Sequence, residues 1–426
     1  MFEPILPDSI DDVRLDDITF WSRREEEREG AFALLRRERP VSFHKEFEPP
    51  PQVPLPQGPG YWAITRHADI LEASRRSDLF CSGKGIQIPD LPEELNEFFG
   101  SMIAMDDPRH ARLRRIVSRG FTPRSLGRIE DEVQSRAVAV IDRVIDRGEC
   151  DFVSDIAAAL PLEIICNMMG IPASQRQFVF DHTNTILGLG DPEYVKPGEN
   201  PLAAALNSGK ALADLMNEIA KERRKTPKDD LTSQLLNAEI ESEALSDQEI
   251  ASFFVLLVAA GNETTRNAIS HGMLALGQHP DERRRWAEDF EAVAPTAVEE
   301  IVRWASPVIH FRRTATEDTQ LGGQKIAAGE KIVLWYNSAN RDEAVFEDPF
   351  RFDVTRTPNE HVGYGGPGVH HCLGANLARR EITVMFRELL RRLPDLEITG
   401  PPERLLSNFI HGIKRMPCAF TPGGAA

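Results

Sequence analysis

A long helical pattern in the second half of the chain limits its fold more than any other feature. Ser246-Asp247-Gln248-Glu249 is a capping box, in which the serine and the glutamate satisfy each other's backbone N–H groups. After it the chain continues without proline to Gln278, which is long for a helix in a globular protein. The apolar residues cover several faces of this helix, so the pattern predicts a buried helix that crosses a large core; they are Ile250, Phe253, Phe254, Leu257 and Val258.

A polar segment interrupts this apolar helix. Ala259-Ala260-Gly261-Asn262-Glu263-Thr264-Thr265-Arg266-Asn267 has small residues followed by polar ones, and apolar residues resume after it. Polar groups inside a buried helix cost stability unless they are satisfied. We interpret the segment as a pocket wall, with room beside Ala260 and Gly261, a hydroxyl at Thr264 and a proton-carrying acid at Glu263. A helix face that emerges into solvent is the alternative.

A glycine-rich loop brings one cysteine to the start of another helix. Residues 361–380 read HVGYGGPGVHHCLGANLARR, and helical spacing follows Cys372. A cysteine at a helix N-terminus lies near orphan N–H donors that favour the thiolate, which is one known axial ligand of haem iron. From this loop alone, a buried core cysteine stays open, and so does a nucleophile with His370 or His371 as its base.

Composition narrows the possible partners. The net charge is −17 at pH 7, with acidic residues spread along the chain, which argues against nucleic acid because nucleic-acid binding needs a basic stripe. The cysteines are scattered and show no CxxC spacing, which argues against a disulfide framework and a structural zinc site; they are Cys81, Cys150, Cys166, Cys372 and Cys418.

The chain shows no sign of membrane insertion. Its N-terminus has no apolar signal core, and the apolar run from Ile250 to Gly261 is too short to span a bilayer. We therefore predict a cytoplasmic protein with no membrane span.

The remaining patterns predict a mainly α fold with a smaller β part, in a single integrated domain over residues 1–426. We find no internal repeat and no clear linker, which favours one domain. The predicted helical body covers roughly residues 107–304 and 372–392, and the β-rich part covers roughly 50–66, 308–336 and 395–420.

Taken together, these stretches resemble the cytochrome P450 family of haem-thiolate monooxygenases, which implies the cytochrome P450 fold. The family's motifs occur in the family's order over nearly the full length, and jointly they are very specific. They are His370 and Gly374 on either side of the cysteine, Ala260-Gly261-Asn262-Glu263-Thr264-Thr265, Glu300-Ile301-Val302-Arg303, Pro349-Phe350-Arg351-Phe352-Asp353-Val354-Thr355-Arg356 and His110-Ala111-Arg112-Leu113-Arg114.

The resemblance implies haem b as the cofactor, with Cys372 as the axial ligand of its iron. Gly368 and Gly374 would let backbone N–H groups point at the sulfur and tune its potential. The other cofactor-binding residues that the family implies are His110, Arg114, Arg313 and His370, which correspond to the haem-propionate partners, and Ala260, Gly366, Gly374 and Ala378.

Glu263 and Thr264 correspond to the family's acid–alcohol pair, which would deliver protons to dioxygen so that its O–O bond breaks heterolytically. A core threonine that hydrogen-bonds back to its own helix is the other interpretation of Thr264. Glu300, Arg303 and Arg356 are implied to be structural. The segments that line the family's substrate pocket contain Met102, Ile103, Ala259, Val308, Ile309 and Phe409, for which core packing is the alternative.

Part of the sequence looks more specifically like actinobacterial hydroxylases of methyl-branched lipids and sterol side chains. The family usually has phenylalanine seven residues before the cysteine, where this chain has Gly365 preceded by Tyr364, so we expect a loop one residue longer. The stretches that carry the likeness are residues 261–267, 363–366 and 374–379, with 405–414 and 101–103 closest to the methyl-branched lipid ω-hydroxylase group.

The resemblance implies an O₂-dependent monooxygenase, with terminal hydroxylation of a methyl-branched lipid, fatty acid or isoprenoid as the main hypothesis. A sterol side-chain hydroxylase is the alternative. A peroxide-driven hydroxylase and a non-catalytic haem-thiolate sensor or lipid-binding protein are further alternatives, which the pair of Glu263 and Thr264 disfavours.

The chain has no room for a fused reductase. Electrons from NAD(P)H would therefore arrive through separate proteins, a ferredoxin reductase and a ferredoxin. An acidic ferredoxin suits a basic patch near the cysteine, for which the candidates are Arg112, Arg115, Arg379 and Arg380. A solvated charged face is the equal alternative for these arginines.

Overall fold

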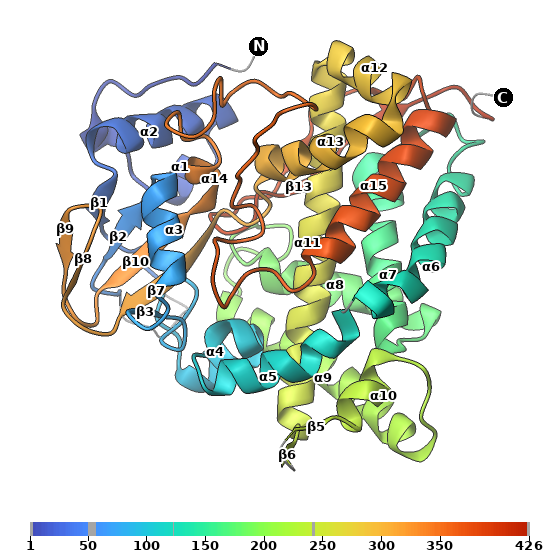
Figure 1. Ribbon diagram of the computed structural model, residues 1–426, viewed down its shortest axis with the longest axis horizontal. Helices are drawn as coiled ribbons and strands as arrows, with labels where there is room; N and C mark the ends of the chain where they lie inside the picture. The colour runs from blue at the N-terminus through green and yellow to red at the C-terminus, as the bar shows by residue number, and fades with distance from the viewer. Residues whose placement is uncertain (1–2, 50–56, 122, 241–242, 424–426) are drawn as a thin grey trace.

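The computed structural model describes residues 3–49, 57–121, 123–240 and 243–423. Figure 1 shows a large helical body beside a smaller β part that packs with the N-terminal helices. This arrangement confirms the predicted mainly α fold with a smaller β part. The predicted β character of residues 50–56 lies outside the described residues, and the extent of the domain over 1–426 stays a prediction.

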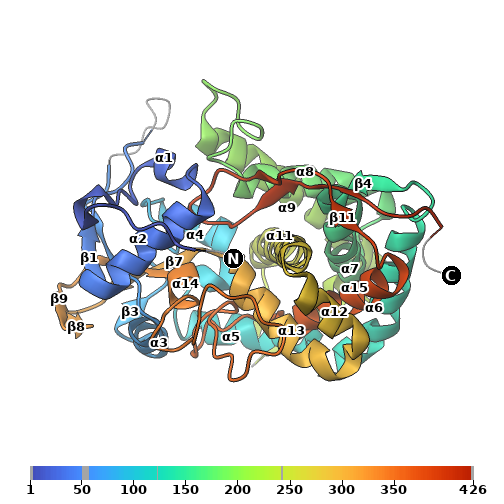
Figure 2. The same cartoon turned by 90° about the horizontal axis from the view of Figure 1, so that it is seen from above.

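The long helix α11, Asp247–Gln278, crosses the whole helical body. It begins at the predicted capping box: Glu249 N–H donates to Ser246 Oγ at 3.1 Å, and Ser246 N–H donates to the Glu249 carboxylate at 2.8 Å. Seen from above in Figure 2, α11 lies in the middle of the other helices, and most of its 32 residues are buried. An apolar surface on every face therefore finds a neighbouring helix on every side.

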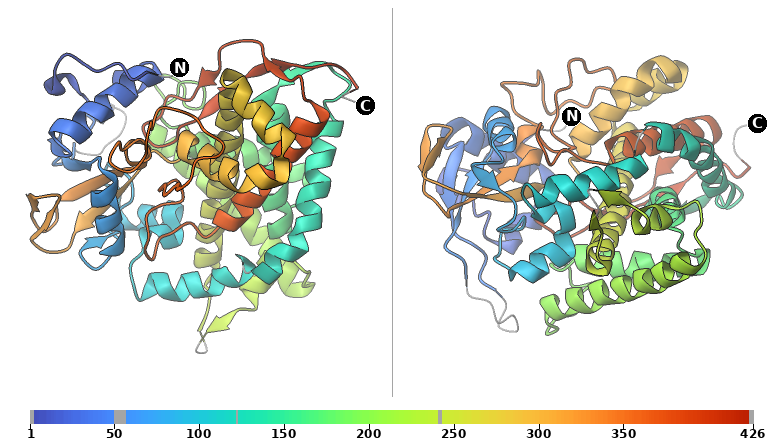
Figure 3. Two further views of the ribbon diagram at one scale, coloured as in Figure 1. Left: turned by 45° about the horizontal axis from the view of Figure 1, so that its top comes forward. Right: turned by 60° about the horizontal axis from the view of Figure 1, so that its bottom comes forward.

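The other helices cover α11 or support the β part. Figure 3 shows α6 and α15 side by side on one flank of the body, where Gln134 donates to Glu388 at 2.9 Å and Arg392 to Asp142 at 2.6 Å. The α-helices are α1 Ile18–Trp21, α2 Glu25–Glu38, α3 His67–Arg75, α4 Glu93–Gly100, α5 Arg109–Val117, α6 Pro123–Asp142, α7 Ala159–Met169, α8 Arg176–Leu187, α9 Pro201–Lys225, α10 Leu231–Leu236, α12 Pro280–Glu288, α13 Phe290–Ala305, α14 Tyr336–Ala339 and α15 Ala375–Arg392.

Short helical turns connect several of these helices. They are the 3₁₀ turns η1 Ile10–Asp12, η2 Ser101–Ala104, η3 Ser118–Phe121 and η5 Ala173–Gln175, and the π-helical turn η4 Phe152–Ala157. The stretch Phe152–Met169, which joins η4 to α7, is long and apolar enough to cross a membrane. Because 67% of this stretch is buried inside the molecule, it has the character of a core helix.

The main sheet has five strands in the order β1-β2-β10-β7-β3. Strands β2 and β10 are parallel, and the other neighbours are antiparallel. Val333 and Trp335 of β10 pack on one face and Ile332 and Leu334 on the other, because side chains alternate along a strand. The strands are β1 Val41–His44, β2 Tyr61–Ile64, β3 Phe80–Cys81, β7 His310–Ala315 and β10 Lys331–Trp335.

The remaining strands form small sheets. Strand β4 lies inside the stretch predicted to be helical, and it pairs with the last strand of the chain. These strands are β4 Glu149–Asp151, β5 Glu239–Ile240, β6 Glu243–Ala244, β8 Thr319–Leu321, β9 Gln324–Ile326, β11 Glu397–Ile398, β12 Glu403–Arg404, β13 Ile413–Arg415 and β14 Pro417–Ala419.

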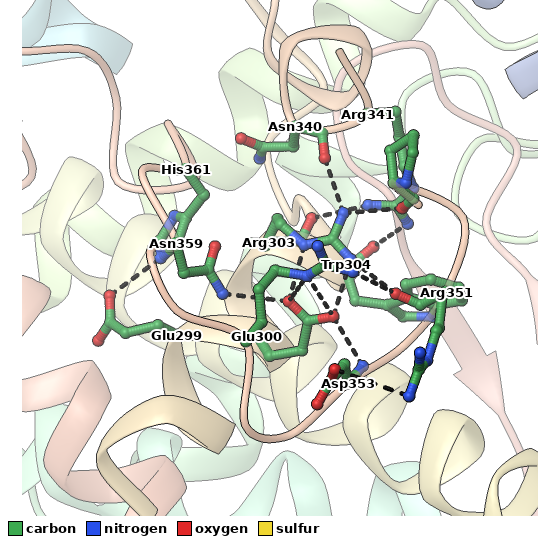
Figure 4. Close-up of polar contacts among 12 residues, drawn as sticks. Glu299, Glu300, Arg303, Trp304, Asn340, Arg341, Arg351, Asp353, Asn359 and His361 are labelled. Carbon is green, nitrogen blue, oxygen red and sulfur yellow. Dashed lines mark hydrogen bonds and ion pairs between the residues drawn. The ribbon is translucent and has the colours of Figure 1, made fainter. Parts of the chain in front are cut away.

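A buried ion pair on α13 ties the helical body to the segment before the cysteine loop (Figure 4). Glu300 and Arg303 are fully buried and pair through two hydrogen bonds of 2.7 Å and 2.8 Å. Arg303 also donates to the main-chain carbonyls of Asn340, Pro349 and Arg351.

Further donors saturate the Glu300 carboxylate. It accepts hydrogen bonds from the N–H of Asp353 at 2.9 Å and from the amide of Asn359 at 3.1 Å, and it pairs with Arg356 at 3.2 Å. A buried pair with all its polar atoms bonded holds its surroundings in one geometry.

We expect Arg303→Met to cost about 3–5 kcal/mol of unfolding free energy, because it leaves the Glu300 carboxylate buried without its main partner. Arg284→Met is the matched control: Arg284 and Asp281 also pair at i,i+3, but their side chains are 63% and 81% exposed. This exposed pair should contribute less than about 1 kcal/mol. Urea unfolding of both variants checks the difference, and equal losses would contradict a structural role for the buried pair.

Candidate active site

A large cavity lies between the middle of α11 and the loop that carries Cys372. Its empty volume is about 1640 Å³, including the space where it opens to solvent. Residues of α11 line one side, and residues of the cysteine loop and the start of α15 line another. The cavity wall contains the sequence-predicted residues Met102, Ile103, Arg114, Ala260, Thr264, Val308, Arg313, Gly366, His370, Cys372, Gly374 and Ala378.

Thr264 is half-buried and lines the cavity. Its hydroxyl donates a hydrogen bond to the carbonyl oxygen of Ala260 at 2.7 Å, so it bonds back to its own helix, which was the second interpretation of this threonine. A hydroxyl oxygen that donates one bond still has acceptor lone pairs. Thr264 therefore both bonds back to its own helix and lines the cavity.

Gly261, three residues before Thr264, allows two helices to pack closely. A Cβ on Gly261 would lie 3.2 Å from the side chain of Ile165 in α7. The missing side chain therefore lets α7 approach α11 closely, in addition to any room that it leaves in the cavity.

Glu263 is buried and does not belong to the cavity wall. One of its oxygens accepts hydrogen bonds from the guanidinium of Arg266 and, at 3.1 Å, from the amide of Asn267. Arg266 also donates to Asn184 of α8 at 3.0 Å. The other oxygen, Glu263 Oε2, has no hydrogen-bond partner in the described part of the chain. In this state the acid lies against α8, so it must change rotamer to reach the cavity.

Cys372 lies just before α15, and its exposed surface faces the cavity. Its N–H donates to the carbonyl oxygen of Tyr364 at 3.0 Å, which fixes the loop across the cysteine. Burial raises the pKa of the Cys372 thiol, while the N–H of Gly374 and the charge of Arg114 act in the opposite direction. The helix N-terminus alone therefore does not produce a thiolate, whereas coordination to a metal deprotonates a thiol.

Two glycines that line the cavity also let the cysteine loop approach α3 closely. A Cβ on Gly366 would lie 2.4 Å from Ser74 Oγ, and one on Gly368 would lie 2.2 Å from the Ser74 main-chain oxygen. Gly368 also has a φ of 147°, which side chains rarely adopt. A Cβ on Gly374 would meet no atom within 4 Å.

Tyr364 lies beneath an arginine of α15. The guanidinium carbon of Arg379 lies 4.3 Å from the centroid of the Tyr364 ring, and Arg379 pairs with Glu299 at 2.6 Å. Burial raises the pKa of the Tyr364 hydroxyl, whose oxygen has no partner among the residues that the structure describes. Gly365 has a φ of 82°, which glycine adopts readily, and the additional residue expected in this loop stays a prediction.

Four donors gather at one end of the cavity. Arg114, Arg313 and His370 line it, and His110 lies behind His370 with their ring centroids 4.3 Å apart. Burial and the charge of Arg313 lower the pKa of His370, which keeps its ring neutral. His110 Nε2 and His370 Nδ1 are buried without partners, and neither Arg114 nor Arg313 pairs with a carboxylate, over the described ranges. This cluster suits a ligand with carboxylates at its edge.

The predicted substrate-pocket residues divide into two groups. Met102 and Ile103 of η2, and Val308 before β7, lie in the cavity wall, whereas Ala259, Ile309 and Phe409 do not.

The residues outside the wall pack elsewhere. Ile309 belongs to the apolar cluster on one face of the main sheet. The Phe409 ring contacts those of His310 and Phe311 with centroids 5.6 Å apart in each case. Ala259 is buried in α11 but faces away from the wall, because successive helical residues point about 100° apart.

Several apolar wall residues were not predicted. Phe253, Leu256 and Leu257 precede Ala260 by seven, four and three positions, the helical spacing that puts all four on one face. That spacing was a usable signal. Ile86 and Phe311 also line the cavity, but they come from segments that only the tertiary fold brings there.

Glu381 of α15 is an acid in the cavity wall, unlike Glu263, and it was not predicted. It is 2% exposed, and burial raises its pKa to about 8, with the side chain of Thr265 acting in the opposite direction. Glu388, two turns later, is equally buried but pairs with Arg391 at 2.9 Å. The sequence alone offers no signal that separates these two glutamates.

Comparison with known proteins identifies the family of the chain that forms this cavity. Residues 86–404 match the cytochrome P450 family, and the chain belongs to it. The chain is 53% identical over 415 residues to the methyl-branched lipid omega-hydroxylase of Mycobacterium tuberculosis, covering 97% of this chain and 95% of that protein. It is 44% identical over 372 residues to a steroid C26-monooxygenase of Mycolicibacterium smegmatis, covering 86% and 85%.

A solved structure shares the fold closely. A Mycobacterium marinum cytochrome P450 in complex with pseudoionone matches this structure with a TM-score of 0.92 and 44% sequence identity, covering 98% of this chain and all of that one (100%). The chain is therefore an O₂-dependent monooxygenase of the cytochrome P450 fold, with haem b as its cofactor.

The cavity has the groups that haem b requires. Cys372 presents its sulfur from one wall, and small residues of the facing α11 leave space beside it. The unpartnered nitrogens of His110 and His370, with Arg114 and Arg313, would hold the two propionates.

The raised pKa of Glu381 predicts a neutral carboxylic acid in the holoenzyme at neutral pH. Infrared difference spectra should show its C=O band, shifted in D₂O, at pH values well below about 8, and the band should decline as the pH rises through about 8. The native state holds this proton more tightly than the unfolded chain, so the stability that it contributes is fully present below the ordinary pKa of 4.5 and is lost as the pH rises from there to about 8. Glu381→Gln should remove the band, and Glu388→Gln is the control. A band unaffected by Glu381→Gln would contradict the assignment.

Proposed function

We propose that this monooxygenase hydroxylates the terminal position of a methyl-branched lipid, fatty acid or isoprenoid. The observation that carries the proposal is the apolar wall beside Thr264, to which η2, α11 and the β7 region contribute Met102, Ile103, Phe253, Leu256, Leu257, Val308 and Phe311. Such a wall binds a hydrocarbon chain by excluding water rather than by hydrogen bonding. The 53% identity to the methyl-branched lipid omega-hydroxylase supports the same substrate class.

The distribution of charge supports attack near a chain end. Among the described wall residues the charged groups are Arg114 and Arg313 at the propionate end and the buried acid Glu381. Arg313 borders the Phe311 end of the apolar wall, with its guanidinium carbon 5.9 Å from the centroid of the Phe311 ring, and no charged residue of η2 or α11 belongs to the described lining. A polar lipid head would therefore stay toward the mouth of the cavity, while the hydrocarbon end reaches the region between Thr264 and Cys372.

Thr264 and Glu263 would handle protons. Bound haem b supplies the activation of dioxygen and the transfer of one oxygen atom to a C–H bond. Thr264 faces the cavity from α11, so its hydroxyl can hold a hydrogen bond to dioxygen and pass on a proton. Glu263 would replace that proton after turning away from Arg266 and Asn267. These two residues hold one of its oxygens, and the other oxygen, Oε2, is free to carry the proton.

Electrons reach cytochromes P450 of this kind from partner proteins. We infer a ferredoxin and a ferredoxin reductase that draws on NAD(P)H, and a cytoplasmic location for all three. Three arginines of the expected docking patch are paired within the chain: Arg112 with Glu249 at 2.8 Å, Arg379 with Glu299 at 2.6 Å and Arg380 with Glu130 at 2.5 Å. Their pairing weakens the positive field of the patch, so the contact with a ferredoxin would depend less on charge than the sequence suggests.

A sterol side chain is the second candidate substrate. It is favoured by the 44% identity to the steroid C26-monooxygenase, and a branched side-chain end would meet the same apolar wall. A panel of methyl-branched fatty acids, linear fatty acids, isoprenoids and sterols, scored by substrate-induced spin shift and product mapping, separates the candidates. We expect terminal products from branched chains; in-chain products, or turnover of sterols alone, would overturn the main proposal.

Cys372→Ala should abolish the red-shifted Soret band that the reduced, CO-bound enzyme shows when a thiolate binds haem iron. Cys166→Ala, which removes a buried thiol of α7, should leave that band unchanged. A persisting red-shifted band in the first variant would refute Cys372 as the axial ligand.

Thr264→Ala should lower product formed per NAD(P)H, with product formation falling on the order of 10²-fold, because the hydroxyl that passes the proton is lost. Substrate affinity should stay the same, and the missing electrons should appear as hydrogen peroxide. Thr264→Ser keeps a hydroxyl at the same position and should restore most of the coupling. Equal coupling in wild type and Thr264→Ala would remove Thr264 from the proton path.

A further inference from the structure

Two thiols meet far from the cavity, in the small sheet with strand order β11-β14-β4. Cys150 of β4 and Cys418 of β14 are direct cross-strand partners, and their sulfur atoms lie 3.4 Å apart. Neither residue belongs to the cavity wall. Figure 2 shows β4 and β11 at the edge of the helical body, on the side where the chain ends.

The strand register fixes the backbone geometry of this pair. Phe420 N–H donates to Gly148 O at 2.9 Å, and Phe152 N–H donates to Met416 O at 2.8 Å. Hydrogen-bonded pairs alternate along an antiparallel ladder, so Cys150 opposite Cys418 is also a hydrogen-bonded pair.

A pair of this kind can accept a disulfide. Its Cα atoms lie about 5.5 Å apart, which is inside the range for disulfides. The sulfurs, now 3.4 Å apart, need to approach by only about 1.4 Å to form a bond of about 2.05 Å. A disulfide also brings its Cβ atoms to about 3.5–4.5 Å, closer than the facing Cβ atoms of a hydrogen-bonded pair, so bond formation draws β4 and β14 together at this point while the strand register stays the same.

The two thiols are chemically different. The two sulfurs share a hydrogen bond in which either thiol can be the donor, and with Cys150 as the donor the bond lowers the pKa of Cys418 and raises that of Cys150. The charge of Arg147 favours a thiolate at the pair, whereas that of Asp155 opposes it. Asp151 also opposes it at Cys418. Cys418 is therefore the sulfur that attacks the oxidant, and Cys150 then attacks the oxidised Cys418.

We propose that Cys150 and Cys418 form a reversible disulfide when the protein meets a peroxide, and that this bond fixes β14 to β4. The Cys418 sulfur attacks one oxygen of hydrogen peroxide: an S–O bond forms, the O–O bond breaks, and the leaving oxygen takes up a proton as water. The Cys150 sulfur then attacks the sulfenic acid, so that an S–S bond forms, the S–O bond breaks and a second water leaves.

The step balances with an oxidant that this reaction class produces. Two thiols and one hydrogen peroxide give one disulfide and two waters. Dioxygen that takes up two electrons and two protons without hydroxylating substrate leaves a monooxygenase as hydrogen peroxide. A cytoplasmic dithiol reverses the bond by thiol–disulfide exchange, so the pair is reduced at rest.

The bond has a structural consequence. The two cysteines are separated by 268 positions in the chain, and a cross-link between distant positions restricts the unfolded chain strongly. It also fixes the strand that leads into η4 and α7, whose Ile165 lines the cavity. The other thiols lack such a partner: Cys81 lies in the main sheet and Cys166 in α7.

Peptide mapping of the holoenzyme tests the proposal without any substitution. The enzyme is treated with a small excess of hydrogen peroxide or with diamide, unfolded, alkylated with iodoacetamide and digested. Mass spectrometry should find one pair of peptides that contain Cys150 and Cys418, joined and lighter by two hydrogens, and dithiothreitol should separate them. Stable sulfinic acid at Cys418, or alkylation of both cysteines after oxidation, would overturn the proposal.

Variants add a second readout. Oxidation should raise the thermal midpoint of the wild type by about 2–5 °C, and dithiothreitol should reverse the rise. Cys150→Ala and Cys418→Ala should lose this shift, while Cys166→Ala should keep it. The same shift in all four proteins would contradict the disulfide. The CO-bound spectrum should stay unchanged throughout, so the outcome does not depend on the proposed substrate.

Discussion

The burial of α11 over most of its length is the constraint on which the rest of this structure depends. Each apolar side chain that it buries contributes about 1.5–3 kcal/mol, but only if other helices cover every face. Its polar break adds a stricter condition, because buried polar groups need partners. Arg266 bonds to Asn184 of α8, and Asn267 accepts a hydrogen bond from Ile413 N–H at 3.1 Å. The positions of α8 and β13 therefore follow from the same nine residues that open the cavity.

The parts of the site that could be predicted are those with a local pattern. The capping box at Ser246, the helix start after Cys372 and the pairing of Glu300 with Arg303 each depend on residues a few positions apart, and all three occur in the structure. The roles of Cys372, Glu300 and Arg303 stay predictions. Ile309 and Phe409 were predicted to line the substrate pocket only because their segments do so in the family. Since neighbouring residues of a strand point to opposite faces, a segment near the cavity does not decide which residue enters it.

Glu381 and the pair of Cys150 and Cys418 show what sequence patterns omit. Burial raises the pKa of Glu381, and this burial comes from the packing of distant segments around α15, which no local pattern in the sequence specifies. The two cysteines looked scattered because 268 positions separate them, and only the register of β4 and β14 brings them together. Closing the loop between such distant segments costs entropy, and the contact between them does not follow from any local residue spacing.

The packing of the cysteine loop against α3 divides its glycines into two kinds. Gly366 and Gly368 have Ser74 where a side chain would stand, whereas Gly374 faces the cavity. The distance between this loop and α3 therefore limits which residues positions 366 and 368 accept, while position 374 has to suit the cofactor that the cavity holds. Neither limit depends on the identity of the substrate, so these glycines distinguish the family from other folds but do not distinguish its members by what they oxidise.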